Sequence, residues 1–451
     1  MTGQSKLAYS LGLPVLTANC YETIHTWNPD CNQAILDILP DSILFCLKTY
    51  APFYLVTSLL AKKGNVRRIN WKRYCIDVAR SSIFLSCNVV LFVFFLCRLR
   101  HVFGFFTPTS MGLLSSLLGS FFSLWVEKRS RWPALALYLT NLASCFRHRH
   151  SASETLFRQL SNHGFIPTIQ NGEVIPFVVG LGLFSYLYSV EKLDASSSKI
   201  FNLTHNIAGA RDIVEEWPLP KEFKGFLSEL RMKYGRTEHC EHKHSCVSVA
   251  TESFGYNFAV GLGASTALTL VQNLPLLVSN PRKLIEKLFS KNTLKIPTFF
   301  GLMPLIFHVS LLDGPSFFVC SLTGVTLVKK RWLVYLRLPL LNFTLLFQAV
   351  RCSLNRLPQS TPVYRNVIAG TASGLAMLAF PNVSISMYVL WKAIETIFYN
   401  LVKEGRIRPM PYGDLFLYTV STAYVLWQIV IEPQAIRKGY LKFLLGLTGN
   451  R

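Results

Sequence analysis

The stretch SSIFLSCNVVLFVFFLCRLRHVF, residues 81–103, decides the class of fold. A helix needs about 20 mostly apolar residues to cross the hydrocarbon core of a bilayer, and this stretch is long enough. Apolar blocks of the same kind recur along the chain, which is 51% hydrophobic and only 16% charged. On a soluble fold such blocks would form patches that drive aggregation, so lipid is the simpler solvent for them.

The apolar blocks predict a polytopic, all-α integral membrane bundle with roughly eight to ten spans. The candidate spans are Ser42–Ala61, Ser81–Phe103, Thr107–Val126, Val174–Val190, Tyr256–Val278, Ile296–Leu312, Trp332–Val350, Val367–Ile397 and Asp414–Ile431. The longest block, Val367–Ile397, holds two passes if the helix breaks at Pro381. Re-entrant or interfacial segments are the alternative for the shorter blocks. Lys and Arg occur in almost every connecting segment, so the loop charges predict no orientation.

The net charge of +22 comes from 46 Lys and Arg against 24 Asp and Glu. These charges form short clusters between apolar blocks, such as Lys62-Lys63, Arg67-Arg68 and Lys72-Arg73. Basic residues beside spanning helices lie at the level of anionic lipid headgroups, which explains the pattern better than nucleic-acid binding does. Membrane lipids are therefore the expected partners, and nucleic acid is not.

A self-match indicates two homologous halves. The matched segments are Ala136–Tyr138 with Ser386–Tyr388, Glu154–Phe157 with Glu395–Phe398, and Asn171–Glu173 with Tyr412–Asp414. In the last two pairs, the two copies are separated by the same number of residues. In the first pair the separation is longer, and the insert Cys145–Ser153 accounts for the difference. We interpret Glu154 and Glu395 as residues at the membrane rim, next to basic neighbours, in preference to intramembrane functional acids.

The repeat and one long polar stretch predict the domain boundaries. Residues 1–41 form a Cys/His-containing N-terminal segment, and residues 42–190 form the first membrane half. Residues 191–255 form a polar connector with a His/Cys cluster, and residues 256–451 form the second membrane half. Such repeats are common in transporters and channels, whose sites lie between the halves. That likeness is one of architecture and does not itself predict transport.

Small residues recur at helical spacing in three of the apolar blocks. They are Gly112, Ser116, Gly119, Ser120 and Ser123, then Gly261, Gly263 and Ala264, and finally Ala369, Gly370, Ser373 and Gly374. Small residues three or four positions apart let helices approach closely in lipid. We interpret them as packing seams; a pore or a lipid groove is the alternative.

Two short segments share the order Cys, Glu, His, Cys, and each precedes the first apolar block of its half. The candidate metal ligands are Cys20, His25 and Cys31 in the first and His239, Cys240, His242, His244 and Cys246 in the second. Thiolate and imidazole are the ligands that zinc prefers. Neither segment has regular C-x₂-C spacing, so zinc or another soft metal stands level with no metal at all. A disulfide within each loop is the third interpretation.

The other cysteines are expected to behave as small hydrophobes within apolar blocks. They include Cys46, Cys87, Cys97, Cys320 and Cys352. The sequence contains no Walker loop, no H-E-x-x-H segment and no nucleophile with a nearby base, so no catalytic residue is assigned and an enzyme is not expected.

Several rare segments resemble the transmembrane protein 135 family, also called the peroxisomal membrane protein 52 family. They are Asn19–Glu22, His25–Trp27, Cys31, Leu47–Leu55, Asn141–Ala143, Glu154–Arg158, Asn171–Val174, Ser384–Tyr388 and Tyr440–Thr448. The resemblance covers nearly the whole chain. Two stretches depart from it: the insert Cys145–Ser153 and a doubtful insert at about residues 310–346, which puts the span Trp332–Val350 in doubt.

This resemblance implies a multi-pass protein of mitochondrial and peroxisomal membranes. It also implies a role in the balance of mitochondrial fission and fusion, together with a dynamin-related fission GTPase, and in peroxisome organisation and lipid and cholesterol homeostasis. The family is distantly similar to the Tim-type translocase superfamily and offers no catalytic residues to carry over. A transporter or translocation channel for lipid or another substrate, working through the cleft between the repeats, is the alternative function. The sequence predicts neither the oligomeric state nor the topology.

Overall fold

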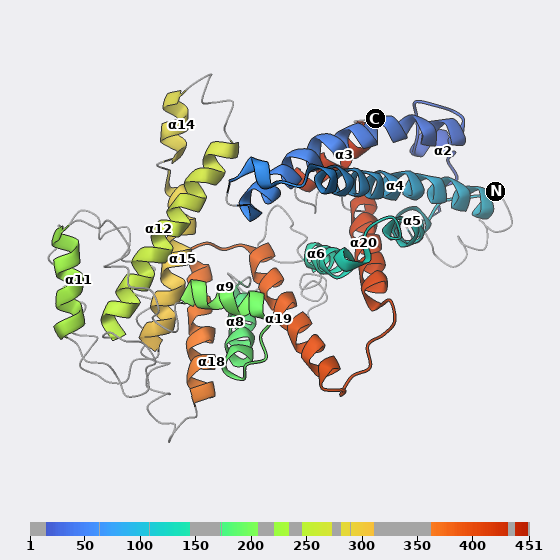
Figure 1. Cartoon of the computed structure of the whole chain (residues 1–451). Helices are drawn as coiled ribbons and strands as arrows, with labels where there is room; N and C mark the ends of the chain where they lie inside the picture. Colours follow the sequence, from blue (N-terminus) through green and yellow to red (C-terminus); the bar gives the residue numbers. More distant parts are fainter. Residues whose placement is uncertain are drawn as a thin grey trace. The chain divides into compact units, whose positions relative to one another are not determined.

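The computed structural model describes residues 15–62, 64–107, 109–144, 172, 174–205, 221–233, 246–272, 281–288, 290–310, 362–431 and 438–449. Within these ranges the chain is helical and forms no strand; one isolated bridge joins Leu16 to Phe106. The all-α prediction is therefore confirmed for this part of the chain (Figure 1). The chain folds as two compact units: unit 1 comprises residues 1–170 and 408–451, and unit 2 comprises residues 171–407.

Unit 1 is built around a long helical hairpin. Its elements are α2 (Cys20–Thr23), α3 (Cys31–Ala61), η1 (Val66–Arg68), α4 (Trp71–Phe103), the π-helical turn η2 (Thr109–Leu114), α5 (Ser115–Leu124), η3 (Arg129–Arg131), α6 (Trp132–Ser144), α20 (Gly413–Ile431) and α21 (Lys438–Leu447). Helices α3 and α4 lie side by side along their length (Figure 1). Helix α4 packs on α5, and α20 packs on η2, α5 and α6.

Sequence explains the ends of α4. The Asn70 side chain accepts a hydrogen bond from the Arg73 backbone N–H at 3.2 Å, which caps the first turn. At the other end Gly104 adopts φ +78°, the left-handed conformation that glycine reaches without steric cost, and its N–H donates to the Arg100 carbonyl. The helix between them is longer than the predicted apolar block because the polar first turns at residues 71–80 continue it.

Two helices of the described part of the chain are long and apolar enough to cross a bilayer. They are Cys31–Leu59, within α3, and Trp71–Phe103, which is α4. Other predicted blocks also form helices, but Thr109–Leu124, Val174–Ser189 and Asn366–Leu378 are shorter apolar helices. The block Trp332–Val350 lies outside the described residues. A count of eight to ten spans therefore stays a prediction.

Unit 2 contains the remaining helices of the described residues. They are α8 (Val174–Ser189), α9 (Ala195–His205), α11 (Lys221–Lys233), α12 (Cys246–Gln272), α14 (Pro281–Leu288), α15 (Lys291–Ser310), α18 (Pro362–Ser373), η4 (Gly374–Leu378) and α19 (Val383–Lys403). Helix α12 packs on α15, α15 packs on α18, and α8 packs on α18, η4 and α19. Phe177, Phe299 and Met377 lie in the apolar core that these helices share.

The helix is interrupted around Pro381, which two passes in the block Val367–Ile397 would require; the passes themselves stay a prediction. The turn η4 ends at Leu378, and α19 begins at Val383. The Asn382 side chain caps the start of α19 by accepting a hydrogen bond from the Ile385 N–H at 3.3 Å. In α19, the Lys392 ammonium and the Glu395 carboxylate lie 2.6 Å apart, as expected for an acid with a basic neighbour. Glu154, its predicted counterpart, lies outside the described residues.

Most of the small-residue positions are close helix contacts. A Cβ atom added at Gly112 would lie 2.7 Å from the Trp427 Cα atom, and one at Gly374 would lie 2.6 Å from the Val178 Cα atom. Cβ atoms at Gly119 and Gly261 would also meet backbone atoms, at 2.9 Å and 2.8 Å. The packing interpretation is therefore confirmed at these positions. At Gly263 it is wrong, because an added Cβ atom would meet nothing within 4 Å.

The two units share one order of packing. In unit 1 the order is α3 on α4, α4 on α5, and α20 against both α5 and α6; in unit 2 it is α12 on α15, α15 on α18, and α8 against both α18 and α19. The sequence match relates α6 to α19 and the start of α8 to the start of α20. Each of these four helices therefore packs on a helix from the other matched segment. The two predicted halves describe a shared ancestry and stay a prediction. Each compact unit contains helices from both predicted halves.

Candidate metal centre

The N-terminal segment folds into a short turn before the long hairpin begins. Helix α2 has one turn, and the Glu22 carboxylate accepts a hydrogen bond from the Asn19 backbone N–H at 2.8 Å. The Thr23 hydroxyl donates to the Asn19 carbonyl at 2.9 Å. Glu22, which stands between Cys20 and His25 in the sequence, therefore stabilises the helix start.

A second turn holds His25 in place. The His25 ring Nδ1 atom lies 2.7 Å from the Asn28 carbonyl oxygen. The Asn28 side chain is held in turn, because its oxygen accepts from the Asp30 N–H at 3.0 Å and its amide donates to Asp37 at 3.1 Å. Helix α3 starts directly afterwards, at Cys31.

Four potential ligands meet at this point: Cys20, His25, Cys31 and Cys97. Each offers one sulfur or nitrogen atom, and these atoms all lie within 4.8 Å of one another. The His25 Nε2 atom is 3.3 Å from the Cys31 Sγ atom. His25 and Cys97 are buried and the other two are half-buried, and all three cysteines carry free thiols. The group could hold one metal ion.

The environment of His25 fixes which ring nitrogen faces the thiols. A backbone carbonyl can only accept, so the 2.7 Å contact with Asn28 requires Nδ1 to carry the proton. The lone pair then lies on Nε2, the atom beside Cys31. Histidine ligands of metals are oriented in this way, by donating the other ring N–H to a carbonyl or a carboxylate.

Burial affects the acidity of the cluster. Burial and, after it, the nearby Cys31 raise the pKa of the Cys20 thiol above its ordinary value. At neutral pH that thiol is therefore protonated unless a cation replaces the proton. Binding of a metal ion to such a cluster releases protons, so its affinity rises with pH.

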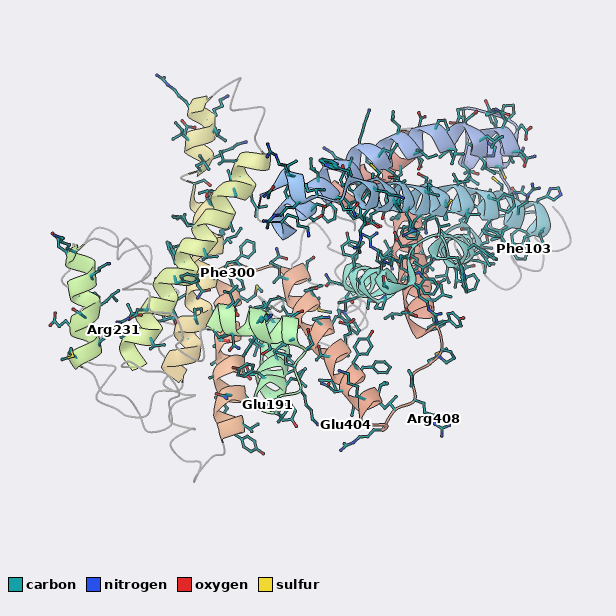
Figure 2. The ribbon with its side chains drawn as sticks, in the orientation of Figure 1. Phe103, Glu191, Arg231, Phe300, Glu404 and Arg408 are labelled. Atoms are coloured by element: carbon teal, nitrogen blue, oxygen red, sulfur yellow. The ribbon has the colours of Figure 1, made fainter. Side chains whose placement is uncertain are left out.

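The segment that carries three of the four residues is fastened to the C-terminal end of α4. The Arg100 guanidinium donates to the carbonyls of Thr17 and Ala18 at 3.0 Å and 3.1 Å. Leu16 and Phe106 exchange two backbone hydrogen bonds, of 2.9 Å and 2.8 Å. Figure 2 labels Phe103, the last residue of α4, at this end of the hairpin.

Apolar side chains enclose the cluster. Ile35, Ile38 and Val93 are buried around it, with Ile24 and Trp27 packed against them. The cluster therefore lies in apolar surroundings, in which electrostatic interactions are stronger than in water.

Three of the predicted ligands are brought together by the fold, and one member of the group was missed. Cys97 is buried in an apolar cluster, as the sequence predicts for a small hydrophobe, and the structure in addition places its thiol beside Cys20 and Cys31. Of the second predicted group, His239, Cys240, His242 and His244 lie outside the described residues. Cys246 begins α12, and its side chain is not described. A duplicated site therefore stays a prediction.

A second polar feature lies inside unit 1, between α4, α5, α6 and α20. The Asn88 amide donates to the Ser123 hydroxyl at 2.9 Å, and the Thr140 and Ser421 hydroxyls lie 3.0 Å apart. These four side chains are buried, as is Gln428 on α20. Hydroxyl and amide groups thus form a polar seam within apolar helices.

Residues 17–158 match the family model described as the N-terminal cysteine-rich region of Transmembrane protein 135. The matched range includes all four members of the Cys/His cluster and both long apolar helices. No solved structure matches the chain. In this region the chain is similar to the transmembrane protein 135 family, and its two long apolar helices are of the kind that a membrane protein has.

Proposed function

We propose that this protein acts, without catalysing a reaction, in mitochondrial and peroxisomal membranes. There it regulates the balance of mitochondrial fission and fusion, the organisation of peroxisomes and the homeostasis of lipid and cholesterol. The observation that supports the proposal is the match of residues 17–158 to the family's cysteine-rich region. The long apolar helices α3 and α4 lie in the same range and suit a protein that works within a bilayer.

The proposal names two kinds of partner. Membrane lipids contact the exposed apolar side chains of the hairpin, such as Leu44, Phe53 and Ile83. A dynamin-related fission GTPase is the protein partner that a role in fission calls for. The exposed basic loop between α3 and α4, with Arg67 and Arg68 on η1, is suited to anionic headgroups at a membrane surface.

The test is a clean deletion in cells, followed by imaging of mitochondria and peroxisomes and by measurement of stored lipid. Elongated or fragmented mitochondria and altered lipid stores are expected, with rescue by the intact chain. Tags at both ends, combined with protease protection, give the organelle and the orientation in the same cells. Unchanged organelle morphology and lipid stores in the deletion would rule the proposal out.

Zinc is the ion that we propose for the Cys/His cluster. Thiols and an imidazole form a soft donor set, which favours zinc over magnesium or calcium. The buried apolar side chains of Ile35, Ile38 and Val93 beside the cluster suit a structural site better than a site for a substrate. This part of the proposal is tested by elemental analysis of purified protein.

Translocation of lipid or another substrate is the second candidate function, and the polar seam of unit 1 favours it. Buried hydroxyl and amide groups within apolar helices can line a path for polar groups; they also serve simply to join helices. Purified protein in vesicles is expected to pass lipid, ion or peptide, and Asn88→Leu is expected to reduce the flux. Vesicles that pass none of the three would remove this candidate and leave the first one standing.

A further inference from the structure

The Cys/His cluster contains one residue that comes from far along the chain. Cys20, His25 and Cys31 lie within one short segment, whereas Cys97 lies on α4, beyond the whole of α3. We propose that Cys97 is the fourth ligand of a Cys₃His zinc site, and that the ion clips the N-terminal segment onto the end of α4. This inference rests on the proposed binding of zinc and adds the closing ligand and the mechanical role of the ion.

The number of ligands supports a closed site. Structural zinc is bound by four protein ligands in a tetrahedron, so three local ligands would leave one position open. With zinc–sulfur distances of about 2.3 Å, sulfur atoms in a tetrahedron lie about 3.8 Å apart. The ligand atoms here lie within 4.8 Å of one another, and His25 Nε2 is already 3.3 Å from Cys31. A contraction of about 1 Å or less would complete the tetrahedron.

The surroundings also suit a bound ion. Fully buried His25 directs Nε2 toward the thiols because Asn28 holds Nδ1, the arrangement that orients histidine ligands of metals. Zinc bound by three thiolates and a neutral imidazole carries a net charge of −1, after release of three protons. Arg100 supplies a positive charge beside the cluster while it binds the carbonyls of Thr17 and Ala18.

A disulfide accounts for the group less well. One disulfide uses two of the three thiols and leaves the third with the buried His25 ring. The three cysteines are free thiols in this structure. A single zinc ion, in contrast, uses every member of the group.

The ion would act as a cross-link over a long stretch of chain. Cys20 and His25 precede α3 and Cys31 is its first residue, whereas Cys97 lies near the end of α4. The ion would therefore link two points of the sequence that are separated by α3 and most of α4. A link that closes a long loop removes more conformational entropy from the unfolded chain than a link within a short loop. The hydrogen bonds of Arg100 and Leu16 hold the same segment independently, so loss of the ion loosens the segment without removing its docking site.

The test compares two cysteine substitutions on α4. The full-length chain is purified in detergent, under reducing conditions and without chelator, as wild type, Cys97→Ser and Cys87→Ser. Cys87 is half-buried on the same helix and lies outside the cluster, so it is the matched control. Elemental analysis is expected to give one zinc per chain fewer for Cys97→Ser than for Cys87→Ser. The difference between the two variants excludes any zinc held elsewhere in the chain.

Two further measurements make the result specific. Competition with a zinc chelator is expected to show at least about a 10- to 100-fold weaker site in Cys97→Ser, since even outer-shell changes cost that much. With Co²⁺ in place of zinc, the thiolate-to-metal charge-transfer band is expected to weaken in Cys97→Ser and to stay unchanged in Cys87→Ser. Chelator added to the wild type gives a control for both measurements. Because the sequence is unchanged there, that control does not depend on how a variant folds.

The rate of proteolysis of the N-terminal segment measures how firmly the ion holds this segment on α4. Chymotrypsin is expected to cleave after the exposed Tyr21 several times faster in Cys97→Ser and in chelated wild type than in Cys87→Ser. Equal zinc affinity in the two variants would overturn the role of Cys97 and leave zinc binding intact. Wild type without zinc, or with a disulfide that joins two of the three cysteines, would overturn both. Neither result bears on organelle function, which the deletion tests separately.

Discussion

Units 1 and 2 share an order of helix packing but differ in their outer helices. In unit 1 the outer pair, α3 and α4, consists of the two helices that are long and apolar enough to span a bilayer. In unit 2 the pair in the same place is α12 and α15; α15 contains Pro297 and Pro304, and neither helix is among the candidate spans. The inner contacts at small residues are common to both units. Close contacts at small residues are therefore common to the two units, and the outer pair of helices is where the units differ.

Buried ion pairs give the largest expected difference between the units. In unit 2, Arg231 of α11, labelled in Figure 2, lies 2.9 Å from the Glu252 carboxylate of α12, and 3% of the Glu252 side chain is exposed. Arg231→Ala leaves that carboxylate buried without its cation, and we expect a loss of about 3–5 kcal/mol in the free energy of unfolding. Denaturant unfolding in detergent measures it. Most of the loss is expected to return in the double variant Arg231→Met with Glu252→Leu.

The matching substitution in unit 1 is Arg131→Ala, and its effect is expected to be smaller. A third of the Arg131 side chain is exposed, at 34%, whereas that of Arg231 is 15% exposed. Glu127 also keeps hydrogen bonds from the Ser81 hydroxyl at 3.0 Å and from the Lys128 N–H at 2.9 Å. Equal losses for Arg131→Ala and Arg231→Ala would contradict this ranking.

Close helix contacts test whether the seams are equivalent. Gly112→Ala in unit 1 and Gly374→Ala in unit 2 each push a methyl group into the backbone of a neighbouring helix. We expect each to lower the free energy of unfolding by about 1–3 kcal/mol, through overpacking. Gly263→Ala is the control, because a Cβ atom there meets nothing, and it is expected to be neutral or to stabilise by up to about 1 kcal/mol. A large loss in the free energy of unfolding for only one of the two variants, Gly112→Ala or Gly374→Ala, would show that the close contacts of the two units are not equivalent.

Much of this architecture could be predicted from local sequence. Apolar blocks mark helices, Pro381 marks the break before α19, and small residues at helical spacing mark close contacts. The contact partners could not be predicted in the same way. A repeat shows which helices are related, but not whether α6 packs on α8 or on α20, because that choice depends on non-local packing.

Cys97 shows the same limit at the candidate site. A single cysteine in an apolar helix has the same local pattern as any small hydrophobe. One signal could have found it: Cys31 stands about 45 Å of helix before the end of α3, and Cys97 about 39 Å after the start of α4, at 1.5 Å per residue. In an antiparallel hairpin with a short turn, such positions lie at nearly the same level. The two positions lie at the same level only when both helices are regular along their length.

Asparagine caps give a smaller effect, expected to be the same in both units. Asn70 caps α4 of unit 1 and Asn382 caps α19 of unit 2, each through one side-chain hydrogen bond to a backbone N–H. Asn70→Ala and Asn382→Ala are each expected to cost about 1 kcal/mol, and the Ser variants much less. Thermal unfolding of the four variants measures this. A loss of stability for only one of the two Ala variants would contradict the expectation that the caps contribute equally in the two units.

The smallest expected effect is electrostatic and belongs to unit 2. A hydrogen bond from the Lys192 ammonium lowers the pKa of Glu404, which is labelled in Figure 2. A carboxyl whose pKa is depressed on folding stabilises the protein above its unfolded pKa, and that contribution is lost as pH falls through the folded value. Glu404→Gln is therefore expected to lower the melting temperature slightly at neutral pH and not at all in acid. A difference that grows on acidification would contradict the assignment.

Translation supplies the helices in an order that does not suit unit 1. Helices α3 to α6 leave the ribosome first, but α20, which packs on η2, α5 and α6, follows only after all of unit 2 has been made. Until then the hydroxyl-bearing side of α5, with Ser116 and Ser120, lacks the helix that covers it in the finished protein. Domains of a growing chain usually fold from the N-terminus onward, but here the unit that begins first receives its last helices only after the other unit has been made. Unit 2, which starts later, is the first of the two units that can be complete.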